Sequence, residues 1–246
     1  MYPEICHLGP FTILSYGLML VLAFFVSAFL CAQQAKKEKM DPDTIFNLLF
    51  VVFISGIIGC RVFYVLNNFS FYFDNPREII MLQHGGMAWF GGLIFGSISA
   101  FLFMKRANLN FLKVADLLVP FVALGQSIGR IGCLLNGCCF GRESQLGLYF
   151  PVFDKVLIPT QMYSSLLLLV IFCILRWMQE NEHSTGMILY SYLFFYSLKR
   201  LGIEFLRNDS PRIFLGLTIF QLLSIVVFVF SCFRLARMFA RAKNNE

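Results

Sequence analysis

The stretch Phe11–Gln33, FTILSYGLMLVLAFFVSAFLCAQ, decides the fold class. It contains no charged side chain, and its polar residues are few and small. A helix rises 1.5 Å per residue, so about 20 apolar residues cross the hydrocarbon layer of a bilayer, which is about 30 Å thick. The stretch therefore predicts a transmembrane helix.

Further apolar segments follow along the chain. Two of them, Met87–Met104 and Leu112–Ile128, are short and interrupted by glycine, but a helix is the structure that shields their backbone groups in lipid. We therefore predict an all-α polytopic membrane protein with about seven transmembrane helices, folded as one transmembrane domain over residues 1–246. The other predicted spans are Ile45–Leu66, Leu166–Met178 with its preceding turn, Gly186–Leu206 and Leu215–Leu235.

The composition of the whole chain agrees with this class. Hydrophobic residues make up 58% of the 246 residues and charged residues 14%, whereas an average soluble domain has about 45–50% and 25%. These values exclude disorder, a secreted disulfide-rich mini-protein and nearly any soluble enzyme of this size. We expect this chain to lie in the lipid bilayer and not to bind nucleic acid.

The distribution of basic residues predicts the orientation. The first ten residues contain no Lys or Arg, whereas Lys36, Lys37 and Lys39 follow the first span. This pattern predicts a retained first span with the N-terminus outside and the C-terminus cytoplasmic. The basic bias toward the inside is small, so many arginines lie where topology does not require them.

The first candidate site is Gly129–Arg142, GRIGCLLNGCCFGR. Its glycines allow tight, irregular backbone and close approach of a ligand, and Arg130, Asn136 and Arg142 supply hydrogen-bond donors. Ionisable residues at membrane depth are costly unless they face a partner or a cavity. We therefore treat this segment as functional.

A second candidate site lies in the predicted span Gly186–Leu206. Its polar residues recur at helical spacing and form one stripe: Tyr196, Arg200, Glu204 and Arg207. The alternative interpretation is a structural ion pair between Arg200 and Glu204. Because guanidinium groups bind phosphate in a bidentate manner, the two arginine-containing segments together favour an anion site for a phosphorylated lipid. An enzyme, a transporter and a lipid-binding protein all remain open at this point.

Three smaller features have structural explanations as well. The glycine pairs Gly85-Gly86 and Gly91-Gly92 are a third candidate site, but close helix packing explains them equally. Gln161, after Pro159, is expected to cap the next helix. Cys133, Cys138 and Cys139 are close in sequence; their spacing is not CxxC and no His is near, so packing of small side chains is favoured over a metal site or a disulfide.

Six motifs in the same order resemble the prolipoprotein diacylglyceryl transferase family of bacterial inner membranes. They are SYGLM (15–19), GCRVFY (59–64), GGMAWFGGLI (85–94), GRIGCLLNGCCFGR (129–142), PTQMY (159–163) and RLGIEFLR (200–207). The resemblance implies transfer of a diacylglyceryl group from phosphatidylglycerol to the lipobox cysteine thiol of a preprolipoprotein, forming a thioether and releasing glycerol phosphate. It implies neither a metal nor a cofactor, and a multi-pass location in the inner membrane.

The resemblance also implies roles for particular residues. Arg130 and Arg200 are expected to be catalytic, because they can neutralise charge on the leaving phosphate. The residues expected to bind substrate are Tyr16, Arg61, Gly91, Gly92, Asn136, Gly141, Tyr196, Glu204 and Arg207.

Three positions depart from the family pattern. Cys133 replaces a frequent Asn, Cys138 replaces a Glu, and Phe90 stands where some members carry a His considered as a base. His84, six residues before Phe90, cannot be assumed to replace it. The proton acceptor thus stays open between an aqueous base, a water relay and a thiol acidified by the arginine field. Two alternative functions are a paralogue with another phospholipid or thiol acceptor, and a non-catalytic phospholipid carrier.

Overall fold

The computed structural model describes residues 4–8, 11–81, 85–207, 212–214 and 216–243. Long helices dominate these ranges, and short strands and helices lie between them. The long helices are α1 (Ser15–Lys37), α2 (Pro42–Asn67), α4 (Trp89–Arg106), α5 (Phe111–Asn136), α6 (Thr160–Glu180), α7 (Met187–Glu204) and α8 (Ile219–Lys243). The short elements are β1 (Glu4–Leu8), β2 (Phe11–Leu14), α3 (Phe69–Asp74), η1 (Pro76–Ile79), β3 (Glu143–Phe150), β4 (Lys155–Leu157), β5 (Arg212–Phe214) and β6 (Leu217–Thr218).

Five of these helices are long and apolar enough to cross a membrane: α1, α2, α5, α6 and α8. Large apolar side chains on their outer faces are exposed, among them Phe29 on α1, Val170 on α6 and Val226 on α8. Apolar surface of this extent is typical of contact with lipid. The chain is therefore a multi-pass helical membrane protein, as the composition predicts.

The helix bounds differ from the predicted spans at several ends. Phe11–Leu14 is extended and pairs as β2 with β1, so the first helix begins at Ser15. The predicted span Leu112–Ile128 continues as a helix to Asn136, through Gly125, Gly129 and Gly132. Two of these glycines let α1 approach: a side chain on Gly132 would meet Met19, and one on Gly125 would meet Ser27.

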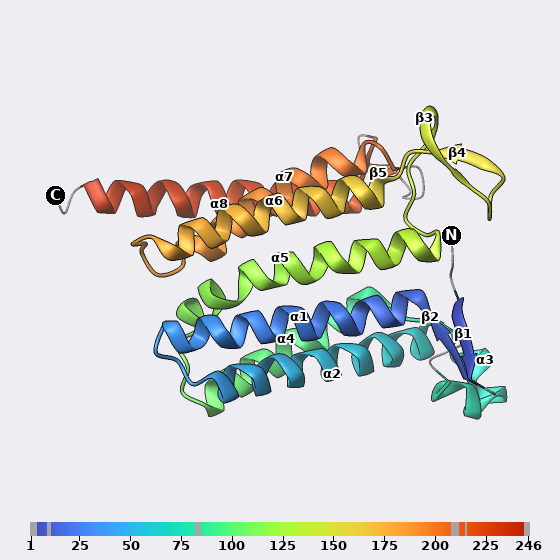
Figure 1. The fold of residues 1–246 in the computed structure, drawn as a ribbon, viewed down its shortest axis with the longest axis horizontal. Helices are drawn as coiled ribbons and strands as arrows, with labels where there is room; N and C mark the ends of the chain where they lie inside the picture. The colour runs from blue at the N-terminus through green and yellow to red at the C-terminus, as the bar shows by residue number, and fades with distance from the viewer. Residues whose placement is uncertain (1–3, 9–10, 82–84, 208–211, 215, 244–246) are drawn as a thin grey trace. The chain divides into compact units, whose positions relative to one another are not determined.

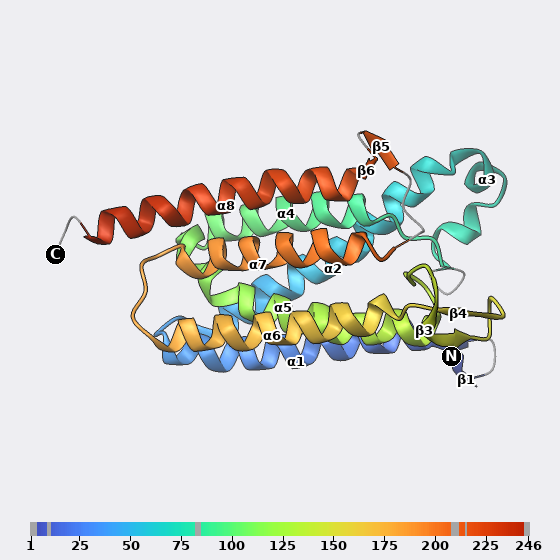
Figure 2. The ribbon, with the colours of Figure 1, turned by 90° about the horizontal axis from the view of Figure 1, so that it is seen from above.

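The chain folds as two compact units, and each is described separately. The first unit contains residues 1–5, 14–27 and 112–246, and the second contains residues 6–13 and 28–111. In the first unit, α6 and α7 run side by side (Figure 1, Figure 2), and α7 also packs against α8. The antiparallel β3–β4 hairpin extends beyond the C-terminal end of α5 (Figure 1).

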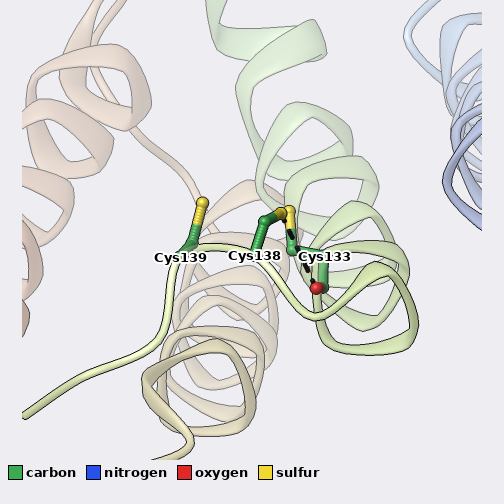
Figure 3. A group of neighbouring side chains, drawn as sticks. All are labelled: Cys133, Cys138 and Cys139. Carbon is green, nitrogen blue, oxygen red and sulfur yellow. Dashed lines mark hydrogen bonds between the residues drawn. The ribbon is translucent and has the colours of Figure 1, made fainter. Parts of the chain in front are cut away.

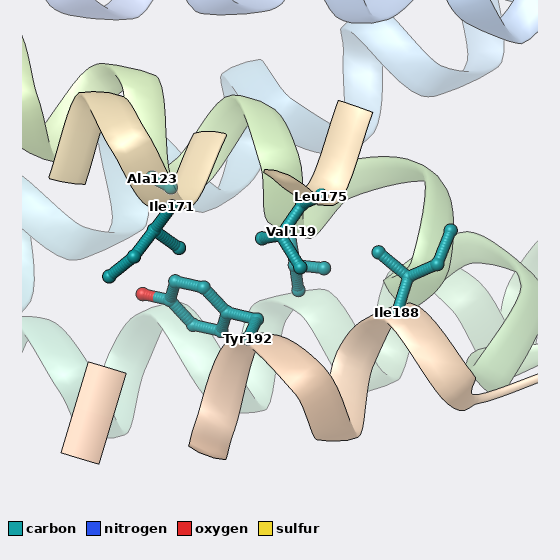
Figure 4. Close-up of a cluster of buried hydrophobic side chains, with 6 residues drawn as sticks. All are labelled: Val119, Ala123, Ile171, Leu175, Ile188 and Tyr192. Carbon is teal, nitrogen blue, oxygen red and sulfur yellow. The ribbon is translucent and has the colours of Figure 1, made fainter. Parts of the chain in front are cut away.

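The core of the first unit lies between α5, α6 and α7. Each helix contributes two buried side chains to one cluster (Figure 4): Val119, Ala123, Ile171, Leu175, Ile188 and Tyr192. The Tyr192 hydroxyl donates to Gln126 Oε1 at 3.1 Å, so its polar end is satisfied inside the apolar contact. This packing fixes α5 and α7, the two helices that carry the predicted catalytic arginines.

Asp116 joins the same two helices through hydrogen bonds. This buried carboxylate on α5 accepts the backbone N–H groups of Gly186 and of Leu189, the latter at 2.8 Å. These groups lie at the start of α7, where backbone donors have no partner within the helix and the helix dipole favours negative charge. Asp116 therefore caps α7 from a neighbouring helix.

In the second unit, α2 and α4 cross at very short range. A Cβ atom on Gly91 would overlap the backbone of Gly59, and one on Gly92 would overlap the Cys60 sulfur. The Ala88 N–H, just before α4, donates to the carbonyl of Cys60 at 3.0 Å. Small residues at a helix crossing let the backbones touch, which is a common way of packing helices in lipid.

Candidate functional site

Basic side chains from α5 and α7 gather in the first unit. Arg130 on α5 interacts electrostatically with Lys199 and Arg200 on α7, and Arg207, just after α7, interacts with Arg200. Among the residues that the structure describes, Glu204 is the carboxylate that faces this group. The described members of this group are therefore mainly basic. We call these five residues the basic cluster.

Arg200 is held on two sides. Its Nη2 lies 3.1 Å from Glu204 Oε2, and its guanidinium lies over the Phe220 ring, 4.6 Å from the centroid. The Glu204 side chain is fully buried, and its other oxygen accepts the Thr218 hydroxyl at 3.0 Å. The structural ion pair considered from the sequence is thus present. It orients the guanidinium, and the catalytic role of Arg200 stays a prediction.

Lys199 is a member of the cluster that the sequence interpretation missed. It is buried, its Nζ donates to Ser164 Oγ at 3.2 Å, and it lies 4.5 Å from the centroid of the Tyr196 ring. Neighbouring helical residues point about 100° apart, so a stripe through Arg200 leaves out residue 199. The signal was the adjacent Lys-Arg pair inside an apolar helix.

Arg130 differs from Arg200 in its surroundings. Its half-buried guanidinium has no hydrogen-bond or salt-bridge partner within the described ranges. Tyr16, on the second residue of α1, interacts electrostatically with Arg130 and lies over Gly132, where a Cβ atom would be 3.5 Å from Tyr16 Cα. The structure therefore brings the predicted residues Tyr16, Arg130, Tyr196, Arg200, Glu204 and Arg207 into the same unit.

The segment Gly129–Arg142 is only partly irregular, which corrects the expectation. Residues up to Asn136 are helical, and the backbone turns at Gly137, whose φ of +73° is in the left-handed region that suits glycine. The N–H of Cys138 then returns to the Cys133 carbonyl at 3.1 Å. Asn136 is the exposed last residue of α5, beside Cys138. Its predicted contact with substrate stays a prediction.

Gly141 lies where two distant segments meet. It forms a β-bridge with Arg207, and the Arg142 N–H donates to the Leu206 carbonyl at 2.9 Å. A Cβ atom on Gly141 would lie 2.7 Å from the Leu206 carbonyl oxygen, closer than any side chain can approach. Gly141 thereby holds Arg207 next to the loop, and direct substrate binding by Gly141 stays a prediction.

Two polar side chains at the start of α6 fix the loop between Gly137 and Gly141. Thr160 Oγ1 donates to the Cys139 carbonyl and Gln161 Nε2 donates to the Cys138 carbonyl, both at 2.6 Å. The expectation that Gln161 caps α6 is wrong, because its side chain bonds the loop and the helix has no side-chain cap. The PTQMY motif thus anchors the GRIGCLLNGCCFGR motif.

The loop also brings three thiols together. The sulfur atoms of Cys133, Cys138 and Cys139 lie within 4.8 Å of one another (Figure 3). The Cys138 thiol donates to the Cys133 carbonyl at 3.7 Å. Hydrogen bonds from Cys133 and then Cys138 lower the pKa of the Cys139 thiol, and the guanidinium groups of Arg130 and Arg207 act in the same direction.

The remaining predicted residues belong to the second unit. Arg61 is buried, and its three guanidinium nitrogens donate to backbone carbonyls between Glu78 and Gly86, including Ile79 at 2.9 Å and Gly86 at 3.0 Å. Gly91 and Gly92 form the crossing of α2 with α4. These contacts give all three a structural task, and their binding of substrate stays a prediction. Phe90 is exposed, and His84 lies outside the described residues.

Fold and cluster together define a class: a multi-pass helical membrane protein with a group of basic side chains inside its first helical unit. Comparison with known proteins narrows the class. The model of the family described as prolipoprotein diacylglyceryl transferase matches residues 3–237, and the chain belongs to this family.

Relatives from several bacterial groups agree with the family match, and each is named phosphatidylglycerol–prolipoprotein diacylglyceryl transferase. The protein of Clostridium tetani is 35% identical over 219 residues, which are 86% of this chain and 87% of that protein. The protein of Clostridium perfringens, whose name carries the number 2, is 33% identical over 88% of both chains. The protein of Trichormus variabilis is 33% identical over 98% of this chain and 91% of its own.

Proposed function

We propose that this protein transfers the diacylglyceryl group of phosphatidylglycerol to the lipobox cysteine thiol of a preprolipoprotein. The names of the relatives supply the two substrates. One observation from the structure supports the assignment: among the described residues of the first unit, the basic side chains Arg130, Lys199 and Arg200 lie together and share the carboxylate of Glu204. Unbalanced buried charge is costly, so an anion such as a lipid phosphate stabilises this arrangement.

The negative charge that develops in this reaction is one that the basic cluster can stabilise. The thiol sulfur forms a bond to the glyceryl carbon, the carbon–oxygen bond to phosphate breaks, and the electron pair leaves with glycerol phosphate. The thiol proton passes to an aqueous base or to a relay of water molecules, or it is lost beforehand from a thiol acidified by the arginine field. Negative charge grows on the leaving phosphate, and donors fixed in advance stabilise it most effectively.

Arg200 and Arg130 take different parts in this scheme. Arg200 is already oriented by Glu204 and Phe220, so it supplies a fixed positive group. Arg130 has free donors within the described part of the chain, and a guanidinium fork can bind two phosphate oxygens at once. The positive field of the cluster also favours the thiolate form of an incoming cysteine.

The topology follows from the same residues. Helices α4 and α7 each have 18 residues, and with the five apolar helices they complete seven spans, with the N-terminus outside and the C-terminus cytoplasmic. The charged residues that keep α7 from being purely apolar are members of the basic cluster. We place the protein in the bacterial inner membrane, with residues 1–246 as one catalytic domain.

The test uses the purified protein in detergent with phosphatidylglycerol and a synthetic lipobox peptide. Mass spectrometry should show one diacylglyceryl increment on the peptide, and none on a peptide with Ser in place of Cys. Arg130→Lys should lower turnover by about 10²-fold or more, as removal of a single donor to a developing oxyanion does. Arg142→Lys is the matched control, because Arg142 belongs to the same sequence motif but is exposed beyond the loop, and it should keep near-parental turnover.

Three outcomes would contradict the proposal. Bound phosphatidylglycerol without any increment would favour a phospholipid carrier. An increment only with another phospholipid or thiol would indicate a paralogue of different specificity. Equal turnover of Arg130→Lys and the parent would show that Arg130 does not hold the phosphate.

A further inference from the structure

The three-thiol cluster is not used by the proposed reaction. We propose that Cys133, Cys138 and Cys139 bind a thiophilic d¹⁰ cation, Zn²⁺ or Cu⁺, through three thiolates. The sequence spacing does not indicate such a site, because Cys133 is on a helix and the other two follow a turn. The fold creates the site by returning the loop to the end of α5 (Figure 3).

The spacing of the sulfur atoms fits a metal ion. A point equidistant from three atoms 4.8 Å apart lies about 2.8 Å from each, and 4.8 Å is the upper limit of these separations. Zinc–thiolate bonds are about 2.3 Å long. A contraction of about half an ångström per sulfur therefore closes a three-coordinate site, and water can supply a fourth ligand to Zn²⁺.

The backbone around the thiols is fixed independently of any ion. Thr160 and Gln161 hold the carbonyls of Cys139 and Cys138, and the Cys138 N–H bonds the Cys133 carbonyl. Cys139 adopts a φ of +64°, a strained value for a residue with a side chain. A fixed loop lowers the entropy lost on binding, because the ligands need little rearrangement.

The charges nearby favour thiolates and select soft cations. Arg130 and Arg207 both interact electrostatically with Cys139, and cationic neighbours stabilise thiolates. Three thiolates carry a charge of −3, so the site with Zn²⁺ has a net charge of −1 and the site with Cu⁺ a net charge of −2. The two guanidinium groups compensate this excess. Thiolate ligands favour Zn²⁺ and Cu⁺ over Mg²⁺ and Ca²⁺, which prefer oxygen.

The thiols are also accessible enough to exchange ions. All three are only partly buried, whereas Cys31 is fully buried within α1. A structural cysteine of the latter kind behaves as a small apolar side chain. Binding exchanges up to three thiol protons for the cation, and these protons are released to solvent.

The experiment titrates the purified full-length protein, reduced and freed of metal by a chelator, with Zn²⁺. Native mass spectrometry should show one ion per chain, proton release should accompany binding, and the melting temperature should rise because the ion binds the folded state. Cys133→Ser, Cys138→Ser and Cys139→Ser should each weaken binding at least about tenfold. Cys173→Ser, which changes an exposed single thiol on α6, is the matched control and should bind like the parent.

A titration with Co²⁺ gives a second measurement that does not depend on stability. Thiolate-to-metal absorption should appear in the parent and in Cys173→Ser, and should be lost in Cys138→Ser. Equal Zn²⁺ affinity in the triple serine variant would overturn the proposal. A disulfide within the cluster in unreduced protein, with no ion bound after reduction, would overturn it in favour of a redox pair.

Discussion

Glu204→Gln isolates the contribution of the buried ion pair with Arg200. The substitution keeps the size of the side chain and an oxygen for the Thr218 hydroxyl, but it removes the charge 3.1 Å from Arg200 Nη2. The Glu204 side chain is 0% exposed and the Arg200 side chain 12%. Removing one partner of a buried pair leaves the other charge uncompensated and costs about 3–5 kcal/mol.

That cost can be measured as a thermal shift in detergent. For a chain of about this length, 1 kcal/mol corresponds to roughly 2–4 °C, so Glu204→Gln should melt roughly 6–20 °C below the parent. Near-UV circular dichroism follows the loss of packing, and size-exclusion chromatography of heated samples checks it. The double variant Arg200→Met/Glu204→Gln should recover part of the loss, because neither charge is left alone.

The chain offers a matched control in the pair Arg176–Glu180 on α6. It has the same i,i+4 spacing and the same 3.1 Å separation, but the Glu180 side chain is 65% exposed. Exposed pairs contribute about 0–1 kcal/mol, so Glu180→Gln should melt within a few degrees of the parent. Equal shifts for the two glutamine variants, or a double variant no more stable than Glu204→Gln, would refute the reasoning that burial makes this pair costly to break.

Three further predictions test other parts of the structure. Asp116→Asn should lower the melting temperature by roughly 3–12 °C, because the amide keeps one acceptor oxygen and loses one charged bond to the start of α7, worth about 1.5–3 kcal/mol; an unchanged melting temperature would contradict the cap. Arg61→Lys should destabilise the protein even without substrate, as one ammonium cannot replace donors on three nitrogens, whereas a loss of lipid binding alone would indicate direct contact. Saturating Zn²⁺ should raise the KM for phosphatidylglycerol severalfold in the parent but not in Cys138→Ser, because the occupied thiol site adds negative charge one helical turn from Arg130.

The membrane class could be predicted because it depends on bulk properties of the sequence. Length and apolar content identify spans whatever their partners are, and the five apolar helices confirm the multi-pass class. The ends of the helices could not be predicted with the same accuracy as the membrane class. Glycines at 129 and 132 favour irregular backbone when the sequence is read alone; in the fold, Gly132 stays helical and lies against Met19 of α1, where a side chain would not fit.

The sequence predicted the charged stripe of the candidate site, but it did not predict the side chains that hold the surrounding backbone in place. Arg200 and Glu204 are four residues apart, so helical periodicity alone places them together. Asp116 and Gln161 act on groups 70 and 23 positions away in sequence, and only tertiary structure brings those groups together. The proximity of the three cysteine sulfur atoms could not be predicted for the same reason, because the turn at Gly137 changes the direction of the chain between Cys133 and Cys138.

The arrangement of the basic cluster explains the role of Glu204, its carboxylate among the described residues. Without Glu204, the guanidinium of Arg200 would lack a partner on its own helix and would be free to turn toward whatever anion is present. With one carboxylate for each basic group, the cluster would be neutral and would not attract phosphate. A single buried carboxylate orients Arg200, and the free donors of Arg130 in the described part of the chain remain for the ligand. Orientation and attraction thus come from different residues, which is why Arg130 and Glu204 should respond differently to substitution: the first in turnover, the second in stability.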